Sequence, residues 1–272
     1  MLAVNHFKRA LRAGQPQIGV WSTIAAPAVC ELVAGAGYDW MMLDTEHTPT
    51  DVPLMLQQLQ AVAAAQPPGG TLPTHAVVRP AWNDPVLIKR YLDIGAQTLL
   101  LPFVQNAQEA EAAVRAMRYA PQGMRGMGGS TRASNLGRTR DYLARAADEL
   151  CLLVQVETGT ALEQIEAIAA VDGVDGIFIG PADLSASLGL PGQTRHPVVS
   201  GAIDDAIRRI RACGKAPGIL MVDEVRAREC LALGAQFVAV ALDTLVLRDG
   251  LDATARRYRG ADAEPTAPTS GY

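Results

Sequence analysis

Eight short apolar or β-branched runs alternate along the chain with longer segments of helical periodicity, and this alternation restricts the possible folds more than any other feature. The runs are nearly all apolar, as parallel strands covered by helices are. Eight strand–helix units in 272 residues predict an α/β fold, a (β/α)₈ TIM barrel, whose typical size is ~250 residues. The runs begin at Gln17, Asp39, His75, Thr98, Leu150, Gly176, Ala216 and Phe237.

A doubly wound parallel sheet is the main competing fold. It would need a G-x-G-x-x-G turn after the first strand, where this chain instead reads WSTIAAP. We therefore expect a single barrel domain over residues 1–260. The last residues, 261–272, read ADAEPTAPTSGY and are expected to form a flexible C-terminal tail.

Composition restricts the binding partners and the cellular compartment that we expect for this protein. A chain with 49% hydrophobic and 19% charged residues is globular, and its net charge of −4 offers no basic footprint for nucleic acid. No apolar run approaches the ~18 residues that span a bilayer. The N-terminus, MLAVNHFKRALRAG, is charged where a signal peptide is apolar, and the four cysteines form no CxxC pair. We expect a soluble cytoplasmic protein that binds neither nucleic acid nor membrane.

Polar residues that close the apolar runs mark the expected active site, because barrel enzymes build their sites at the carboxyl ends of the strands. Glu157 and Asp183 close adjacent strands and could share one hard divalent cation such as Mg²⁺ or Mn²⁺. The absence of His or Cys beside them argues against zinc. The alternative is that both carboxylates only cap helices.

A second group of polar residues closes the second and third strands. Asp44 stands three residues before His47, and a carboxylate near an imidazole can make it a general base. The alternative is that His47 is a loop histidine without a role. Arg79 interrupts an apolar strand, where a buried guanidinium must face an anion. That anion is either a substrate oxygen or, in a purely structural salt bridge, Glu46 or Glu157.

The lysines argue against a Schiff-base mechanism, which aldolases on this fold often use. The chain has three lysines, Lys8, Lys89 and Lys215. The first precedes the barrel, the second is on a helix, and the third comes just before a strand, at the wrong end. Strands seven and eight also lack the Gly-rich turns of a barrel phosphate site, which disfavours a sugar-phosphate substrate.

Four blocks of the sequence together resemble a known family. They read WSTIAAPAVCELVAGAGYDWMMLDTEH, VVRPAWNDPVLIKRYLDIGAQTLLLPFVQNAQEAEAAVRAMRYAPQGMRGMG, LVQVETGTALEQIEAIAAVDGVDGIFIGPADLS and GKAPGIL. In order and spacing they closely resemble the HpcH/HpaI family of class II pyruvate aldolases, over about residues 7–257. The resemblance implies a TIM barrel of the phosphoenolpyruvate/pyruvate type. It also implies a carbon–carbon lyase that reversibly cleaves 4-hydroxy-2-keto acids to an aldehyde and pyruvate or hydroxypyruvate.

The resemblance also assigns roles to residues. It implies that Glu157 and Asp183 hold Mg²⁺, Mn²⁺ or Co²⁺, that Asp44 and His47 form an acid/base dyad, and that Arg79 contacts the keto or enolate oxygen. The implied substrate-binding residues are Trp21 as an aromatic wall, Gln155 beside the metal, Gly180 and Pro181, the amides of Ala182 and Asp183 for the substrate carboxylate, and Met221 after the seventh strand. The resemblance further implies a homohexamer in which the last helix, near residues 251–257, packs on a neighbouring subunit.

The chain departs from the family pattern where the acceptor aldehyde should bind. The segment STRASNLGRTRDYL offers Arg132, Arg138 and Arg140 either for an acceptor carboxylate or as a solvated lid. A CoA-ester lyase of the citrate or malyl type is the alternative enzyme, with the arginine-rich segment 125–145 meeting the nucleotide phosphates. A barrel that has lost activity and serves as a binding protein is the non-enzymatic alternative. It predicts a missing catalytic group, and none is missing.

Overall fold

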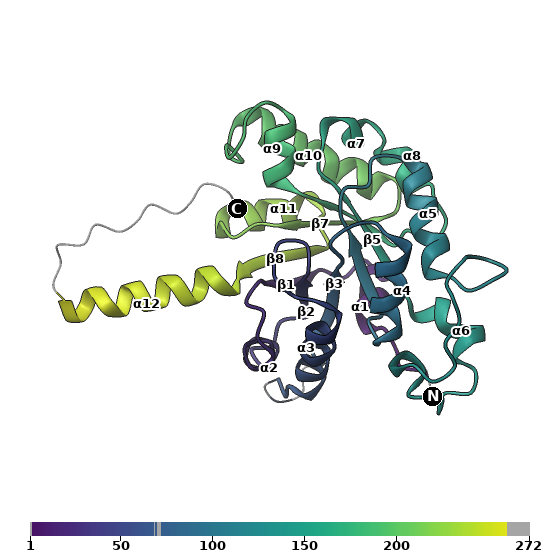
Figure 1. Ribbon diagram of the computed structural model, residues 1–272. Helices are drawn as coiled ribbons and strands as arrows, with labels where there is room; N and C mark the ends of the chain where they lie inside the picture. Colours follow the sequence, from purple (N-terminus) through teal and green to yellow (C-terminus); the bar gives the residue numbers. More distant parts are fainter. Residues whose placement is uncertain (1, 68, 70–71, 260–272) are drawn as a thin grey trace.

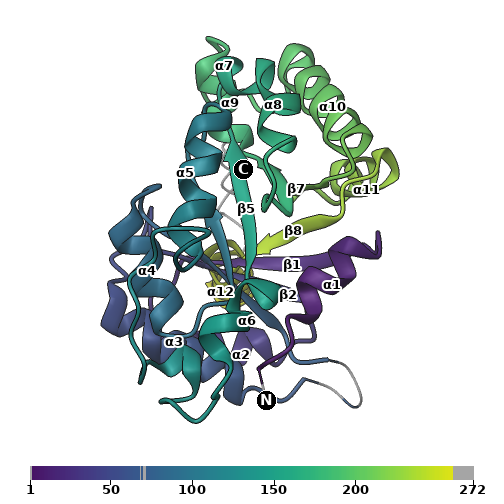
Figure 2. The ribbon, with the colours of Figure 1, turned by 90° about the vertical axis from the view of Figure 1, so that its right-hand side faces the viewer.

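The computed structural model describes residues 2–67, 69 and 72–259. Its strands form one closed parallel barrel in chain order, as Figures 1 and 2 show. The eight predicted strands and the barrel are confirmed, and the doubly wound sheet is excluded. The predicted C-terminal tail, 261–272, lies outside the described residues. The strands are β1 (Gln17–Ser22), β2 (Trp40–Asp44), β3 (His75–Arg79), β4 (Thr98–Leu101), β5 (Cys151–Val156), β6 (Gly176–Ile179), β7 (Ala216–Leu220) and β8 (Phe237–Leu242).

Helices surround the barrel, and several start with proline in the first turn behind a capping side chain. Asp51 and Asp84, for example, accept hydrogen bonds from the first-turn amides of their helices. No described helix is long and apolar enough to cross a membrane. The helices are α1 (His6–Arg12), α2 (Pro27–Ala34), α3 (Val52–Ala64), α4 (Pro85–Asp93), α5 (Ala107–Met117), α6 (Tyr142–Glu149), α7 (Gly159–Glu163), α8 (Ile165–Ala169), α9 (Pro181–Ser187), α10 (Pro197–Ala212), α11 (Glu224–Leu233) and α12 (Asp243–Arg259), with a 3₁₀ turn η1 (Arg132–Ser134) before α6.

Two packed layers form the core, and the alternation of side chains along each strand separates them. In β2, Met41 and Leu43 belong to the layer between strands and helices, whereas Trp40 and Met42 belong to the cluster inside the barrel. Asp44 continues the inward row and therefore ends it at the carboxyl end of the barrel. Side chains also alternate along the other strands, and an inward-facing side chain at a strand's carboxyl end lies at the mouth of the barrel.

The amino end of the barrel is closed by α1. The ring of Phe7 is buried and stacks on His75, with ring centroids 5.4 Å apart, and it also contacts Trp40 and Phe237. Glycine makes room for these rings, because a Cβ on Gly19 would lie 2.2 Å from the Trp40 indole. The packing of these aromatic rings fills the barrel interior at this end.

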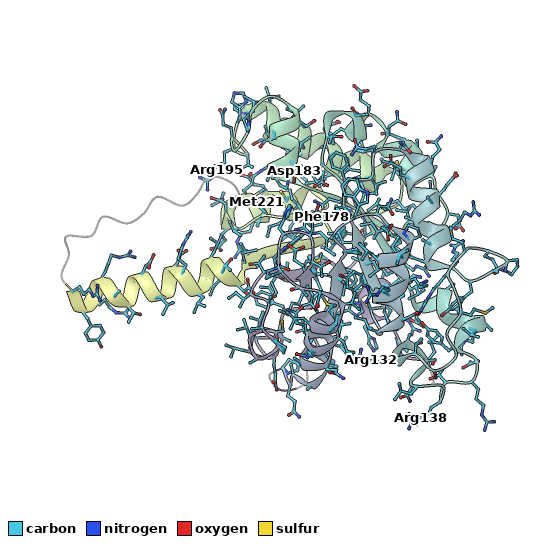
Figure 3. All side chains as sticks on the ribbon, in the orientation of Figure 1. Arg132, Arg138, Phe178, Asp183, Arg195 and Met221 are labelled. Atoms are coloured by element: carbon cyan, nitrogen blue, oxygen red, sulfur yellow. The ribbon has the colours of Figure 1, made fainter. Side chains whose placement is uncertain are left out.

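The arginine-rich segment between α5 and β5 lies at the amino end of the barrel. Arg132 donates a hydrogen bond of 2.9 Å to the carbonyl of Ile94, just after α4, and Figure 3 shows Arg132 and Arg138 far from Asp183. The prediction that Arg132, Arg138 and Arg140 could meet an acceptor carboxylate or cover the site is therefore wrong. The reason is topological: the end of α5 and the start of β5 both lie at the amino edge of the sheet, so the loop joining them does too.

Candidate active site

A cavity of about 390 Å³ opens at the carboxyl ends of the strands, within the size range of ~300–1,000 Å³ typical of ligand sites. Most of the predicted site residues meet in it, although they come from strands far apart in the sequence. The lining residues are Trp21, Thr23, Asp44, His47, Arg79, Gln155, Phe178, Gly180, Pro181, Ala182, Asp183, Leu220, Leu242, Thr244, Leu245 and Arg248. Glu157 is 2% exposed and is not among these lining residues, but it accepts a hydrogen bond from Gln155, which is.

Arg79 is held rigidly by two acidic side chains. Its Nε and Nη2 donate to the two carboxylate oxygens of Asp44 at 2.8 and 2.7 Å, and its Nη1 lies 2.8 Å from Glu46 Oε2. Its guanidinium also lies 4.7 Å from the ring centre of Trp21. Burial lowers the pKa of Arg79, but these acids outweigh it and raise the pKa above its ordinary value. The salt bridge to Glu46 is thus present, together with one to Asp44.

His47 does not make the contact that the dyad hypothesis suggested. Both carboxylate oxygens of Asp44 accept from Arg79, and one also accepts from the backbone N–H of Glu46. The nearest acid to His47, among the described residues, is Glu46, with Nε2 and Oε2 3.9 Å apart, and the His47 side chain is 64% exposed. The structure therefore makes Asp44 a partner of Arg79 and leaves His47 at the rim of the cavity.

Glu157 is a buried carboxylate whose hydrogen bonds, within the described part of the chain, come from neutral donors. The backbone N–H of Phe103 donates to Oε1 at 2.8 Å, and the Gln155 amide donates to Oε2. Its pKa is raised to about 7, mainly by burial, with charge repulsion from Asp183 and Glu46 adding to the rise and the hydrogen bonds from Gln155 and Phe103 opposing it. A carboxylate so placed favours a nearby positive charge.

Asp183 approaches Glu157 from the next strand along the barrel. It lies in the first turn of α9, after Gly180 and Pro181, and the neighbouring Ala182 also lines the cavity. Glycine is required at 180, because a Cβ there would lie 2.6 Å from Glu157 Oε2 and 3.0 Å from the Gln155 amide nitrogen. Gly180, the first residue of GPADLS, therefore leaves room for the Glu157 carboxylate beside the start of α9.

The residues present fit a divalent metal ion. Glu157 and Asp183 repel each other, Glu157 has no cationic partner among the described ion pairs, and Gln155 Oε1 is buried without a hydrogen-bond partner. The described residues contain no group of three or more His, Cys, Asp or Glu side chains that could hold a metal. The ion would thus keep coordination positions for water and substrate oxygens, as Mg²⁺ does.

Met221 does not have the surroundings that the family resemblance implied for it. Met221 is buried in the layer between strands and helices, and Leu220 lines the cavity in its place. The alternation along β7 was the missed signal, because Ala216 and Leu220 both belong to the interior cluster. The cavity also has lining residues from the start of α12, among them Arg248, that the strand-end argument could not reach.

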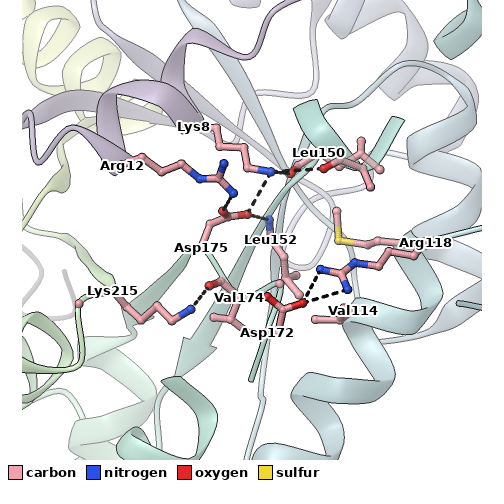
Figure 4. Close-up of a pocket in the computed structure, with 14 residues that line it drawn as sticks. Lys8, Arg12, Val114, Arg118, Leu150, Leu152, Asp172, Val174, Asp175 and Lys215 are labelled. Carbon is pink, nitrogen blue, oxygen red and sulfur yellow. Dashed lines mark hydrogen bonds and ion pairs between the residues drawn. The ribbon is translucent and has the colours of Figure 1, made fainter. Parts of the chain in front are cut away.

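No lysine is among the described residues that line this cavity. Lys8 and Lys215 instead line a separate hollow of about 250 Å³ at the amino end, shown in Figure 4. There the Lys8 ammonium donates to the Leu150 carbonyl, and Lys215 donates to the Val174 carbonyl at 2.6 Å. The third lysine, Lys89, lies on α4. This placement agrees with the expectation that no imine is formed.

Comparisons with known proteins agree with this geometry. The family model for HpcH/HpaI aldolase/citrate lyase matches residues 17–250. The chain is 55% identical, over 94% of its length and 98% of the relative's, to a "Pyruvate aldolase" of Rhizobium etli. It is 54% identical to a "4-hydroxy-2-oxo-heptane-1,7-dioate aldolase" of Klebsiella pneumoniae, over 93% of this chain and 94% of that protein.

Solved structures show the same fold. An HpcH/HpaI aldolase/citrate lyase family protein from Burkholderia cenocepacia superposes with a TM-score of 0.89 at 37% identity, over 94% of this chain and all of that one. The citrate lyase β subunit of M. tuberculosis, with a TM-score of 0.55 and 18% identity over 86% of this chain and 93% of its own, shares the fold alone. The chain belongs to the HpcH/HpaI aldolase/citrate lyase family, a family of carbon–carbon lyases.

Proposed function

We propose that this protein cleaves 4-hydroxy-2-keto acids reversibly to pyruvate and an aldehyde, with a divalent metal ion as cofactor. The single observation that carries the proposal is the buried Glu157 carboxylate, which is bonded to neutral donors, is repelled by Asp183 and lies next to the cavity that Asp183 and Arg79 line. Close relatives named as aldolases favour this reaction over a CoA-ester lyase. The position of the arginine-rich segment, at the opposite end of the barrel, gives no support to nucleotide binding there.

Glu157 and Asp183 would hold the metal ion, which when bound supplies a Lewis acid at the 2-keto group. The amides of Ala182 and Asp183, at the start of α9, bind the substrate carboxylate. Either Mg²⁺, Mn²⁺ or Co²⁺ suits a site made of carboxylate oxygens and water. These groups would bind the 2-keto acid end of the substrate in the cavity that Arg79 also lines.

Arg79 stabilises the negative charge that develops on the keto oxygen during cleavage. A guanidinium has five N–H donors, of which two donate to Asp44, while Glu46 lies beside Nη1 as an ion-pair partner. The other donors can bind the enolate oxygen. Because the two acids hold the planar fork in place before the substrate arrives, little reorganisation accompanies the reaction. Asp44 is thus a positioning residue that acts through Arg79.

His47 removes the proton of the 4-hydroxyl group in cleavage and returns it in addition. It lines the cavity at its rim, where the aldehyde end of the substrate would lie. Glu46 is its nearest acid, and burial raises the pKa of Glu46 to about 7, although the charge of Arg79 lowers it. Histidine is the side chain that most often performs such a proton transfer.

The test is a retro-aldol assay over a panel of 4-hydroxy-2-keto acids, with detection of pyruvate and of hydroxypyruvate. We expect chelation to abolish cleavage and Mg²⁺, Mn²⁺ or Co²⁺ to restore it. Treatment with borohydride and pyruvate should leave the mass of the protein unchanged. A lysine adduct, or cleavage that survives complete removal of metal, would show that the proposed reaction is wrong.

We further propose that α12 mediates association into a homo-oligomer, a hexamer as in the family expectation. Figure 1 shows α12 extending away from the barrel, and among its described residues only Asp243 is buried. Val246, Leu247 and Leu251 are between 51 and 62% exposed on it. A second copy would cover such an apolar surface. Light scattering should give the mass of an oligomer, and Leu247→Glu with Leu251→Glu should lower it; a wild-type monomer at micromolar concentration would contradict the proposal.

A further inference from the structure

Arg248 stands apart from the other charged residues of the active-site cavity. Among the described lining residues the two arginines are Arg79 and Arg248. The first is bound to Asp44 and Glu46, as shown above. Arg248 comes from the second turn of α12 and lies outside that carboxylate cluster. It was not identified from the sequence, because it follows the strand end by six residues.

Hydrogen bonds attach the start of α12, the helix that carries Arg248, to the barrel. The buried carboxylate of Asp243 accepts hydrogen bonds from the Ser22 hydroxyl at 2.7 Å and from the backbone amides of Thr23 and Ile24 at 2.9 and 3.0 Å. Thr244 and Leu245 line the cavity together with Arg248, a spacing that places them on one side of the helix.

The guanidinium of Arg248 has donors to spare. Its described partner is Asp249, the next residue, whose Oδ1 lies 2.9 Å from Nε and from Nη2. The Asp249 side chain is 65% exposed, and an exposed pair of this kind contributes little free energy. Three of the five N–H donors are therefore available to a substrate carboxylate, which could also compete with Asp249 for the other two.

Leucine side chains line the cavity together with Arg248. Leu220, Leu242 and Leu245 line the cavity, and the last two, with Arg248, also line an adjoining hollow of about 770 Å³. Arg248 therefore lies at the boundary between the active-site cavity and the adjoining hollow. A ligand that reached it from the carboxylate cluster would lay methylene groups along leucine side chains and end in an anion at the guanidinium.

We propose that Arg248 binds the anionic end of the acceptor aldehyde, so that the enzyme prefers aldehydes bearing a distal carboxylate over neutral aldehydes of similar length. This inference rests on the proposed function. It adds a specificity-determining residue on α12 to a site otherwise built from strand ends. A planar fork suits a carboxylate, which accepts two parallel hydrogen bonds.

The test compares two acceptors in the addition reaction with pyruvate and Mg²⁺: 4-oxobutanoate and its neutral methyl ester. For the wild type we expect kcat/KM to favour the acid. Arg248→Ala should lower kcat/KM for the acid by about 10- to 100-fold, as loss of a charged hydrogen bond does, mainly through the KM of the aldehyde, and should lower it far less for the ester. Arg248→Lys should keep part of the preference, because it keeps the charge.

Arg195→Ala is the matched control, since Arg195 lines only the adjoining hollow and pairs with Asp223 at 2.6 Å. It should keep the wild-type ratio of acid to ester. Exchange of the methyl protons of pyruvate with D₂O by the wild type reports the donor half-reaction without any acceptor. Absence of this exchange would overturn the proposed function. Normal exchange with the same acid-to-ester ratio in wild type and Arg248→Ala would overturn only the role of Arg248.

Discussion

Arg79 and Asp44 face each other on adjacent strands and form a two-pronged ion pair. They are register partners of β3 and β2, and Nε–Oδ1 and Nη2–Oδ2 measure 2.8 and 2.7 Å. The pair is almost fully buried, with side chains 7% and 1% exposed. An enzyme that needs a cation at a fixed position can hold it there in this way, at the cost of desolvating both groups.

Replacing Arg79 should remove stabilisation of the transition state. We expect Arg79→Lys and Arg79→Ala to lose ~10²–10³ in kcat, roughly 3–4 kcal/mol, because a lysine ammonium cannot reproduce the planar fork. Arg79→Ala should also unfold at a lower temperature, since it leaves the buried Asp44 carboxylate unpaired. The measurement is the exchange of pyruvate methyl protons with D₂O. Wild-type exchange in Arg79→Ala would mean that the arginine is purely structural.

Glu157→Gln should abolish metal binding without lowering the stability of the metal-free protein. The amide has nearly the shape of the carboxylate but carries no charge, so metal-induced thermal stabilisation should disappear. Without metal the variant should be at least as stable as the wild type at neutral pH, because burial disfavours the Glu157 charge. Calorimetry with and without Mn²⁺ measures both effects. Glu163→Gln, on the exposed surface of α7, is the control and should behave as the wild type does. Metal-induced stabilisation that survives in Glu157→Gln would rule out Glu157 as a ligand.

The stability of the metal-free protein should depend on pH in a defined window. Burial raises the pKa of both Glu46 and Glu157 from 4.5 to about 7. At a pH between about 4.5 and about 7, Glu46 and Glu157 keep their protons in the folded protein but have lost them in the unfolded chain. The free energy of unfolding should therefore fall as pH rises from about 4.5 to about 7. Urea unfolding across this range measures the slope, which should be smaller in Glu157→Gln. A rising or flat profile in the wild type would contradict the assignment.

Gly180→Ala should damage the metal site without disturbing the barrel elsewhere. Its Cβ would overlap Glu157 Oε2 and Cβ, at 2.6 and 2.8 Å, and push the carboxylate away from Asp183. We expect weaker Mn²⁺ binding by titration calorimetry and a matching loss of cleavage activity. Gly201→Ala in α10 is the control, because a Cβ there meets nothing within 4 Å and alanine favours a helix by ~1 kcal/mol. Equal Mn²⁺ affinity in both variants would show that Gly180 is not needed for the site.

The sequence by itself determined the barrel and most of the strand-end residues of the site. Each apolar run is long enough to be a buried strand, and the residue that ends it must lie at the mouth of the barrel, so Asp44, Arg79, Gln155 and Glu157 could be placed from local pattern alone. The family likeness added Trp21 and the amides of Ala182 and Asp183. These inferences need only the periodicity of the strands and the common direction of parallel strands.

The tertiary structure alone decided which of these residues touch. Asp44 pairs with Arg79 rather than His47, because the register of β2 against β3 sets the two side chains opposite each other and the loop carries His47 outward. Leu220 rather than Met221 faces the cavity, since side chains alternate in β7. The arginine-rich segment lies at the amino end of the barrel, away from the cavity, whereas Arg248 of α12 lines the cavity. Such contacts depend on strand register, side-chain alternation and the direction in which a helix leaves its strand, which are set by packing over the whole barrel and not by the residues near them in sequence.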